Sequence, residues 1–177
     1  MSNLLDYLKW RGDLSLKAVA LGEMDALVLS RLSYLPMEGL VQDDFTASIP
    51  LGEVLTACRA RARDTQDERL AYRMKEDDDL IAALLDSPRF LDARLTGLHS
   101  RFDPALEQQF CAVTLLLPDD TAYLVFRGTD GTVVGWKEDF NMCFADAVPA
   151  QTEALAYLRR GGARPRAGRL RPRRPGL

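Results

Sequence analysis

The feature that most constrains the fold is a pair of β-rich runs, the second of which ends in a glycine-rich turn. Residues 110–117 (FCAVTLLL) and 121–126 (TAYLVF) are β-branched, aromatic and aliphatic, and the sequence PDD separates them at 118–120. Proline and aspartate favour tight turns, so the two runs predict an antiparallel hairpin. The second run is followed at once by RGTDG at 127–131. We therefore expect a strand that ends at residue 126 and is followed by a sharply turned loop.

Helices are predicted ahead of this hairpin. Apolar residues recur at helical spacing in residues 4–10 and 25–35, and Pro36 ends the second run. Pro50 suits the start of a third helix, one face of which carries Leu51, Val54, Leu55 and Cys58. The acidic cluster at 76–79 is expected at the N-terminus of a fourth helix, where the helix dipole favours acids; a metal site is the alternative. The sequence SP at 87–88 ends that helix, and residues 94–98 predict a short strand.

A last helix is predicted from Pro149 to Leu158, with Ala150, Ala154 and Leu158 on one stripe. A helix that leaves a sheet in this way normally crosses over to a further parallel strand. The order of elements predicts the α/β class, with helices first, then a β-hairpin and a crossover helix. No strand-like run follows, so we expect an exposed apolar edge on the hairpin and poor solubility as its consequence.

Four stretches of the chain resemble the class 3, or fungal-lipase-like, α/β-hydrolases, and most closely an uncharacterised bacterial branch of them. They are NLLDYLKWRGDLS at 3–15, MDALVLSRLSYL at 24–35, FRGTDGTVVGWKEDFNM at 126–142 and VPAQ at 148–151, and the resemblance covers about residues 1–158. It implies the N-terminal portion of an α/β-hydrolase-like fold. It also implies a family that cleaves small ester or lipid substrates by serine catalysis.

The resemblance implies that the turn at 127–131 is the first oxyanion loop of such an enzyme. Ester hydrolysis passes through a tetrahedral intermediate with a negative oxygen, which needs fixed hydrogen-bond donors. Thr129, with Asp130 beside it, could donate a backbone N–H and a hydroxyl there. Four further residues are expected to support the loop: Gly128 for the sharp turn, Arg127 and Asp139 as an ion pair beneath it, and Trp136 as an anchor on the apolar body.

Two other functions fit parts of this segment. The sequence RGTDG is also an ordinary turn after a buried strand. A non-catalytic protein-interaction domain is a separate alternative, since the helical first half of the chain could dock a partner. A phosphate-binding loop needs Gly-Lys followed by Ser or Thr, whereas Trp136 separates Gly135 from Lys137 and Glu138 stands at the hydroxyl position. We therefore expect neither a nucleotide nor any other cofactor.

The other half of a serine-hydrolase site is missing from the sequence. A nucleophile elbow places a serine ahead of an acid and a histidine in the chain. The last serine is Ser100 and the only histidine is His99, and both precede the loop. Cys143 has no later histidine to activate it, so it is expected to be a buried or half-buried structural cysteine. No catalytic residue is assigned, and we expect the chain itself to be inactive.

Residues 159–177 differ sharply in composition from the rest of the chain. They contain eight arginines and no acid, which leaves 15 basic and 26 acidic residues in 1–158. Their residue types have GC-rich codons, so we interpret 159–177 as a disordered, frameshift-derived tail on a truncated hydrolase domain at 1–158. Binding to RNA or DNA phosphates is the alternative, but the segment lacks aromatic residues for base stacking. No specific nucleic-acid partner is expected.

The composition of the chain indicates where in the cell the protein is located. The chain is 47% apolar, yet no apolar run approaches the ~18 residues that span a bilayer. The N-terminal sequence MSNLLDYLKWRGD contains acids and lysine, unlike a signal peptide. Three separated cysteines with no CxxC pair suit a reducing compartment, so a cytoplasmic protein is expected. The oligomeric state is not predicted by these patterns.

Overall fold

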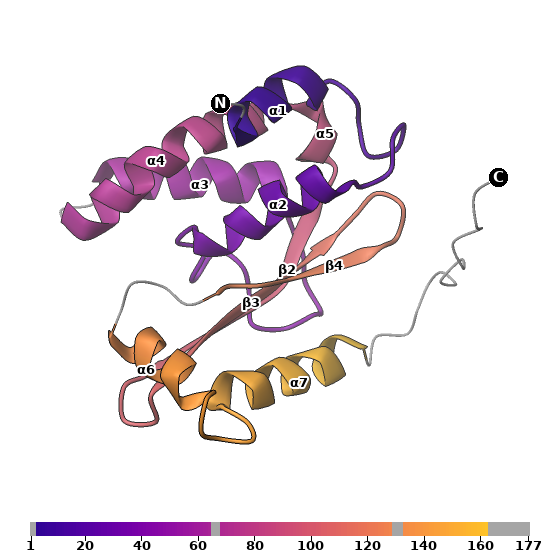
Figure 1. Cartoon of the computed structure of the whole chain (residues 1–177). Helices are drawn as coiled ribbons and strands as arrows, with labels where there is room; N and C mark the ends of the chain where they lie inside the picture. The colour runs from indigo at the N-terminus through magenta and orange to yellow at the C-terminus, as the bar shows by residue number, and fades with distance from the viewer. Residues whose placement is uncertain (1–2, 65–67, 129–132, 163–177) are drawn as a thin grey trace.

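The computed structural model describes residues 3–64, 68–128 and 133–162, and in them the protein has mixed α/β structure (Figure 1). The helices are α1 (Leu4–Arg11), α2 (Glu23–Arg31), the short 3₁₀ helix η1 (Leu32–Tyr34), α3 (Leu51–Asp64), α4 (Glu68–Leu85), α5 (Pro88–Leu91), α6 (Val133–Asn141) and α7 (Pro149–Gly162). The strands are β1 (Ile49–Pro50), β2 (Arg94–Asp103), β3 (Gln108–Leu116) and β4 (Ala122–Phe126). The predicted order, with helices before a hairpin and a final helix after it, is confirmed.

The four strands form one antiparallel sheet in the order β1-β2-β3-β4. The predicted hairpin is β3–β4, in which Val113 lies opposite Val125. β2 is longer than the expected strand at 94–98 and runs to Asp103, because it pairs with β3 over most of that strand's length. β4 is therefore an edge strand of the described sheet.

A bulge at Gly97 bends β2. The register with β3 shifts between Thr96 and His99, and Gly97 has φ +64°, a conformation that other residues rarely adopt. A Cβ atom at this position would lie 2.4 Å from a ring carbon of Phe45. Glycine is thus required here both by the backbone angle and by the close approach of an aromatic ring.

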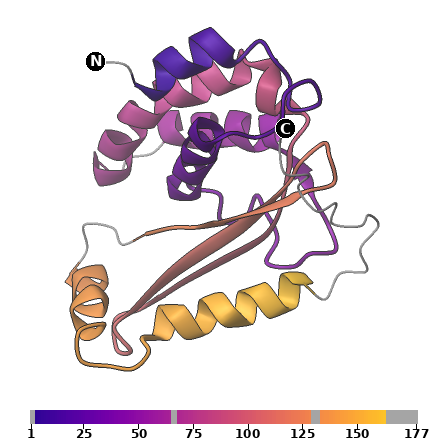
Figure 2. The ribbon, with the colours of Figure 1, turned by 45° about the vertical axis from the view of Figure 1, so that its right-hand side comes forward.

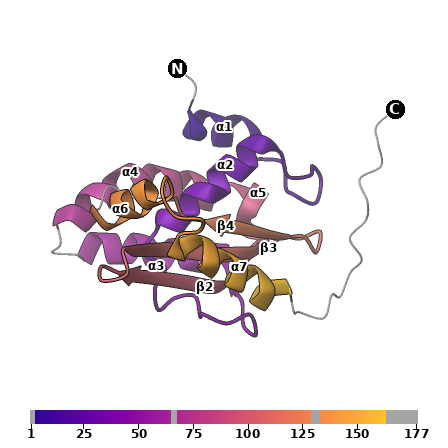
Figure 3. The same ribbon diagram turned by 60° about the horizontal axis from the view of Figure 1, so that its bottom comes forward.

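Helices cover both faces of the sheet, which gives the molecule three layers (Figures 1, 2 and 3). Helices α1 to α5 lie on one face, and α6 and α7 lie on the other. The larger core lies under α1 to α5 and includes fully buried Leu55, Ile81 and Leu95. A smaller cluster of Phe110, Ala112 and Tyr157 joins α7 to β3. Both faces of the sheet are buried because residues of alternating orientation meet helices on each side.

Most predicted helix positions are confirmed, and the buried face of α3 includes the four residues expected there, Leu51, Val54, Leu55 and Cys58. The acidic cluster at 76–79 was misplaced, since it lies inside α4 and not at its start. Two of its members instead make ion pairs with other helices: Asp77 with Arg31 at 2.8 Å and Asp78 with Arg59 at 2.7 Å. The sequence SP at 87–88 also begins the next helix: Pro88 is the first residue of α5, and Ser87 is its N-cap.

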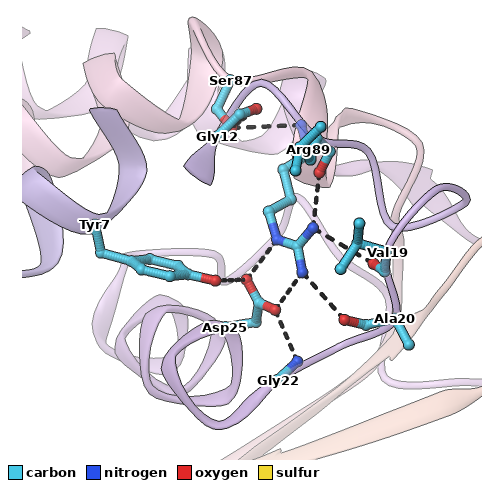
Figure 4. A network of polar contacts seen from close by, with 9 residues as sticks. Tyr7, Gly12, Val19, Ala20, Gly22, Asp25, Ser87 and Arg89 are labelled. Carbon is cyan, nitrogen blue, oxygen red and sulfur yellow. Dashed lines mark hydrogen bonds and ion pairs between the residues drawn. The ribbon is translucent and has the colours of Figure 1, made fainter. Parts of the chain in front are cut away.

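A buried polar network joins α1, α2 and α5 (Figure 4). Arg89, which is 1% exposed, donates from its guanidinium to both carboxylate oxygens of Asp25, which is fully buried. Tyr7 donates its hydroxyl proton to the same carboxylate at 2.6 Å. The remaining Arg89 N–H groups bond the backbone carbonyls of Leu14, Val19 and Ala20. The network therefore fastens the segment between α1 and α2 to the start of α5.

Candidate functional site

The strand end that carries the predicted oxyanion loop lies at the sheet edge. β4 ends at Phe126, and the backbone N–H of Arg127 still donates to the carbonyl of Cys111 at 2.8 Å. Gly128 follows close to the side chain of Tyr34, whose hydroxyl would lie 3.4 Å from a Cβ atom placed on that glycine. Thr129 and Asp130, the expected oxyanion residues, lie outside the described residues. Their role stays a prediction.

α6 is held against the sheet by Glu138, a residue that the sequence analysis did not single out as a contact. Glu138 is 5% exposed, and its carboxylate accepts from the backbone N–H of Gln109 at 3.0 Å and of Ala150 at 2.8 Å. Ala150 lies in the first turn of α7, where free N–H groups and the helix dipole favour a negative charge. Glu138 therefore links β3, α6 and α7. No local pattern distinguishes it from its neighbour Asp139, because its burial depends on contacts distant in sequence.

The outer face of α6 is apolar and exposed. Trp136 is 70% exposed, and with Val133 and Phe140 it lines an open groove of about 520 Å³. The expectation that Trp136 anchors the loop on the apolar body is wrong, because the buried side of α6 is the one that carries Glu138. Asp139 is exposed on α6 and Arg127 is half-buried at the end of β4; their pairing stays a prediction.

Polar residues border one side of this groove. The carboxylate of Glu107 accepts from Lys137 at 3.0 Å and from the amide of Asn141 at 2.8 Å. The hydrogen bond from Asn141, and then the bond and charge of Lys137, hold the pKa of Glu107 below its usual value. Glu107 is thus an ionised partner that fastens α6 to the β2–β3 turn.

His99 lies on β2 between two carboxylates, as a strand residue. Its Nδ1 is 2.8 Å from Asp43 and its Nε2 is 3.3 Å from Glu153 on α7. Both ring nitrogens thus lie against acids, whereas a histidine that activates a nucleophile has a hydroxyl or thiol beside one of them. The same acids also pair with arginines, Glu153 with Arg101 and Asp43 with Arg160. The arrangement holds α7 against β2, and the absence of a catalytic role for His99 stays a prediction.

The cysteines are placed differently from one another. Cys58 and Cys111 are buried, and burial raises the pKa of both thiols, to about 11 for Cys58. Cys143 is exposed, so its expected burial is wrong. It lies in the turn that follows α6. The two buried thiols stay protonated at neutral pH and are poor nucleophiles.

Within residues 3–64, 68–128 and 133–162, no group of three or more His, Cys, Asp or Glu side chains is arranged to hold a metal ion. In the same part of the chain, no helix has both the length and the apolar character needed to cross a membrane. The carboxylates of the described clusters are instead used in ion pairs and backbone hydrogen bonds.

Comparison with family profiles gives a match to the second half of the chain. The profile of the Mbeg1-like family matches residues 84–164, which run from the end of α4 through α7. This span contains β2, β3, β4 and both helices of the second face, together with the whole strand end described above. No curated protein and no solved structure matches the chain.

Proposed function

We propose that the chain is a lipase-like α/β-hydrolase scaffold that carries the first oxyanion loop but no serine and histidine placed for catalysis. The observation that supports this most is the path of the chain at the end of β4. An edge strand stops at Phe126, turns through Arg127 and Gly128, and is followed by two helices on one face of the sheet. A loop at the end of a rigid strand is a suitable place for donors that must not move during reaction.

The second half of this proposal, that the chain is inactive, is supported by the positions of its serines and its histidine. His99 is occupied by Asp43 and Glu153, and every serine precedes residue 101. Without nucleophile and base, an oxyanion hole by itself leaves only weak catalysis. The substrates of the parent family would be small esters or lipids, which this chain is expected to leave intact.

A fluorophosphonate probe and a short-chain p-nitrophenyl ester test this function. We expect no covalent labelling of the purified chain and no ester turnover above a heat-denatured sample. Labelling at a mapped serine would show a nucleophile in this chain and overturn the inactive assignment. Sequencing of the gene downstream of the codon for Ala154 tests the scaffold: a strand followed by Gly-x-Ser-x-Gly in another reading frame is expected, and its absence in all frames would count against a hydrolase.

A non-catalytic interaction domain is the second candidate, and the exposed face of α6 favours it. Val133, Trp136 and Phe140 are each at least 66% exposed. Exposed aromatic groups of this size are typical of surfaces that bind other molecules. The two candidates differ in the role of Trp136: its replacement by serine would weaken partner binding in the second case only.

A further inference from the structure

The open edge of β4 has outward backbone groups that no strand of the described sheet pairs with. The N–H of Leu117 donates to the carbonyl of Thr121, and that of Arg127 donates to Cys111, both at 2.8 Å. Because antiparallel pairing alternates, Tyr123 and Val125 also direct their backbone groups at β3. Ala122, Leu124 and Phe126 therefore direct their N–H and C=O groups away from the sheet. β4 has no strand partner on that side among the described residues.

On one face of the sheet, α7 presents apolar side chains next to the open edge of β4. Glu153 and Arg160 bind residues on the β2 side of the molecule. With 3.6 residues per turn, Leu158 lies on the opposite side of α7, towards β4, and Leu155 lies next to it. Both leucines are about half exposed, at 47% and 49%. A strand added to β4 would therefore meet apolar side chains on this face.

On the other face of the sheet, α2 presents apolar side chains next to the same edge. Tyr123 on β4 donates its hydroxyl proton to the carbonyl of Ala26 at 3.3 Å, which places α2 beside this face. α2 exposes two large apolar side chains, Met24 at 43% and Leu27 at 54%. A strand between α2 and α7 would be enclosed on both faces, and strands of that kind are apolar throughout.

We propose that a second copy of this chain occupies this position, through antiparallel pairing of β4 with β4 about a two-fold axis at Leu124. The sequence AYLVF of β4 has no charge, proline or glycine, so it lacks the features that normally prevent edge strands from pairing. A two-fold axis at Leu124 places Ala122 opposite the partner's Phe126. Every outward N–H and C=O group of one copy then finds a partner in the other.

The charges at the two ends of β4 select the antiparallel direction. Exposed Asp119 and Asp120 precede the strand and Arg127 follows it. In the antiparallel register, Arg127 lies opposite the partner's Thr121 and diagonal to the partner's Asp119, within reach of a long side chain. Parallel pairing would bring acid to acid and arginine to arginine. This interface goes beyond the proposed function and does not depend on it, since pairing would occur with or without ester turnover.

Proline at position 124 tests the interface with little disturbance of the fold. Because the N–H of Leu124 points outward, Leu124→Pro removes a bond to the partner but none to β3, and proline is tolerated on edge strands in this orientation. Leu124→Ala shortens the same side chain and keeps the N–H. Sedimentation and light scattering are measured for the full chain between roughly 1 and 100 µM. Circular dichroism melts show whether each variant is folded.

We expect the wild type and Leu124→Ala to have twice the 19.8 kDa chain mass and Leu124→Pro to be a folded monomer. Arg127→Asp should weaken the dimer roughly two- to fivefold, and Asp119→Arg combined with it should restore most of the loss. A monomeric wild type at the highest concentration would overturn the proposal. A Leu124→Pro dimer as tight as that of Leu124→Ala would also overturn it. If the dimer were instead lost in Trp136→Ser, the interface would be α6 and not β4.

Discussion

Arg89 and Asp25, which are 64 residues apart in the sequence, form a fully buried ion pair that joins α5 to α2. Each of the two side chains is only 1% exposed, and Tyr7, Gly22 and three backbone carbonyls complete the hydrogen bonds of the pair. Burial of two charges is costly, and the cost is offset only when the remaining donors and acceptors are satisfied. In this pair the remaining donors and acceptors are satisfied. The pair therefore fixes the geometry of the helical layer, and its polar groups are all used in these contacts.

Removal of one member of this pair should destabilise the protein severely. Arg89→Met leaves the carboxylate of Asp25 buried without its cation, and we expect a loss of about 3–5 kcal/mol in the free energy of unfolding. The double variant Asp25→Leu with Arg89→Met should lose less than Arg89→Met alone, because it buries no unpaired charge. Urea titrations followed by circular dichroism measure both. Equal losses in the two variants would contradict this account.

The same pair should make stability depend on acid pH. Burial by itself raises the pKa of Asp25, but hydrogen bonds from Arg89, Tyr7 and Gly22 outweigh it and hold the pKa below the usual value of 3.8. The ionised form is therefore favoured by folding. Its contribution is complete above pH 4 or so and is lost as pH falls through the lowered pKa of the folded state.

Melting temperatures measured between about pH 2 and pH 6 test this dependence. The wild type should lose stability towards the acid end more steeply than Asp25→Asn, which has no carboxylate to protonate at this position. Parallel pH curves for the two proteins would show that Asp25 is not the group responsible.

Glu138 should be necessary for the attachment of α7. Glu138→Ala removes the carboxylate that accepts from the part-buried N–H groups of Gln109 and Ala150, and we expect a loss of about 1–3 kcal/mol in the free energy of unfolding. Hydrogen exchange should accelerate most at these two amides. The control is Asp146→Ala, which changes an exposed acid in the loop before α7 and should shift stability by less than about 0.5 kcal/mol. Unchanged exchange at Ala150 would contradict the role of Glu138.

Gly97 should tolerate no side chain. Gly97→Ala combines an unfavourable positive φ with a contact of 2.4 Å to Phe45, so we expect a loss above about 1 kcal/mol. Gly52→Ala is the matched control, since its Cβ would meet Leu91 at an ordinary 3.6 Å within α3. That change should stabilise the helix by about 0.5–1 kcal/mol. Thermal melts of both variants give the comparison, and a neutral Gly97→Ala would show that the bulge can relax.

The candidate site was predictable only where its residues act locally. The strand end at Phe126, the turn before β4 and the helix that begins at Pro149 follow from patterns of a few neighbouring residues. Trp136 and Cys143 were expected to contact the apolar body of the protein, but both side chains are exposed. The contacts of Glu138 with β3 and α7 determine which side of α6 faces the sheet, and these contacts are distant in sequence. The support that matters most for α6 was thus the least visible in the sequence.

The sequence by itself determined the order of helices and strands, the hairpin of β3 and β4, and the apolar face of α3, because periodicity and turn residues act over short distances. It also determined that no histidine follows the loop. Tertiary structure decided the partners of charged side chains: Asp25 with Arg89, His99 with Asp43 and Glu153, and Glu138 with two backbone amides. A charged residue looks the same in sequence whether it is solvated or buried, and only the packing of distant segments determines which of them must find a partner.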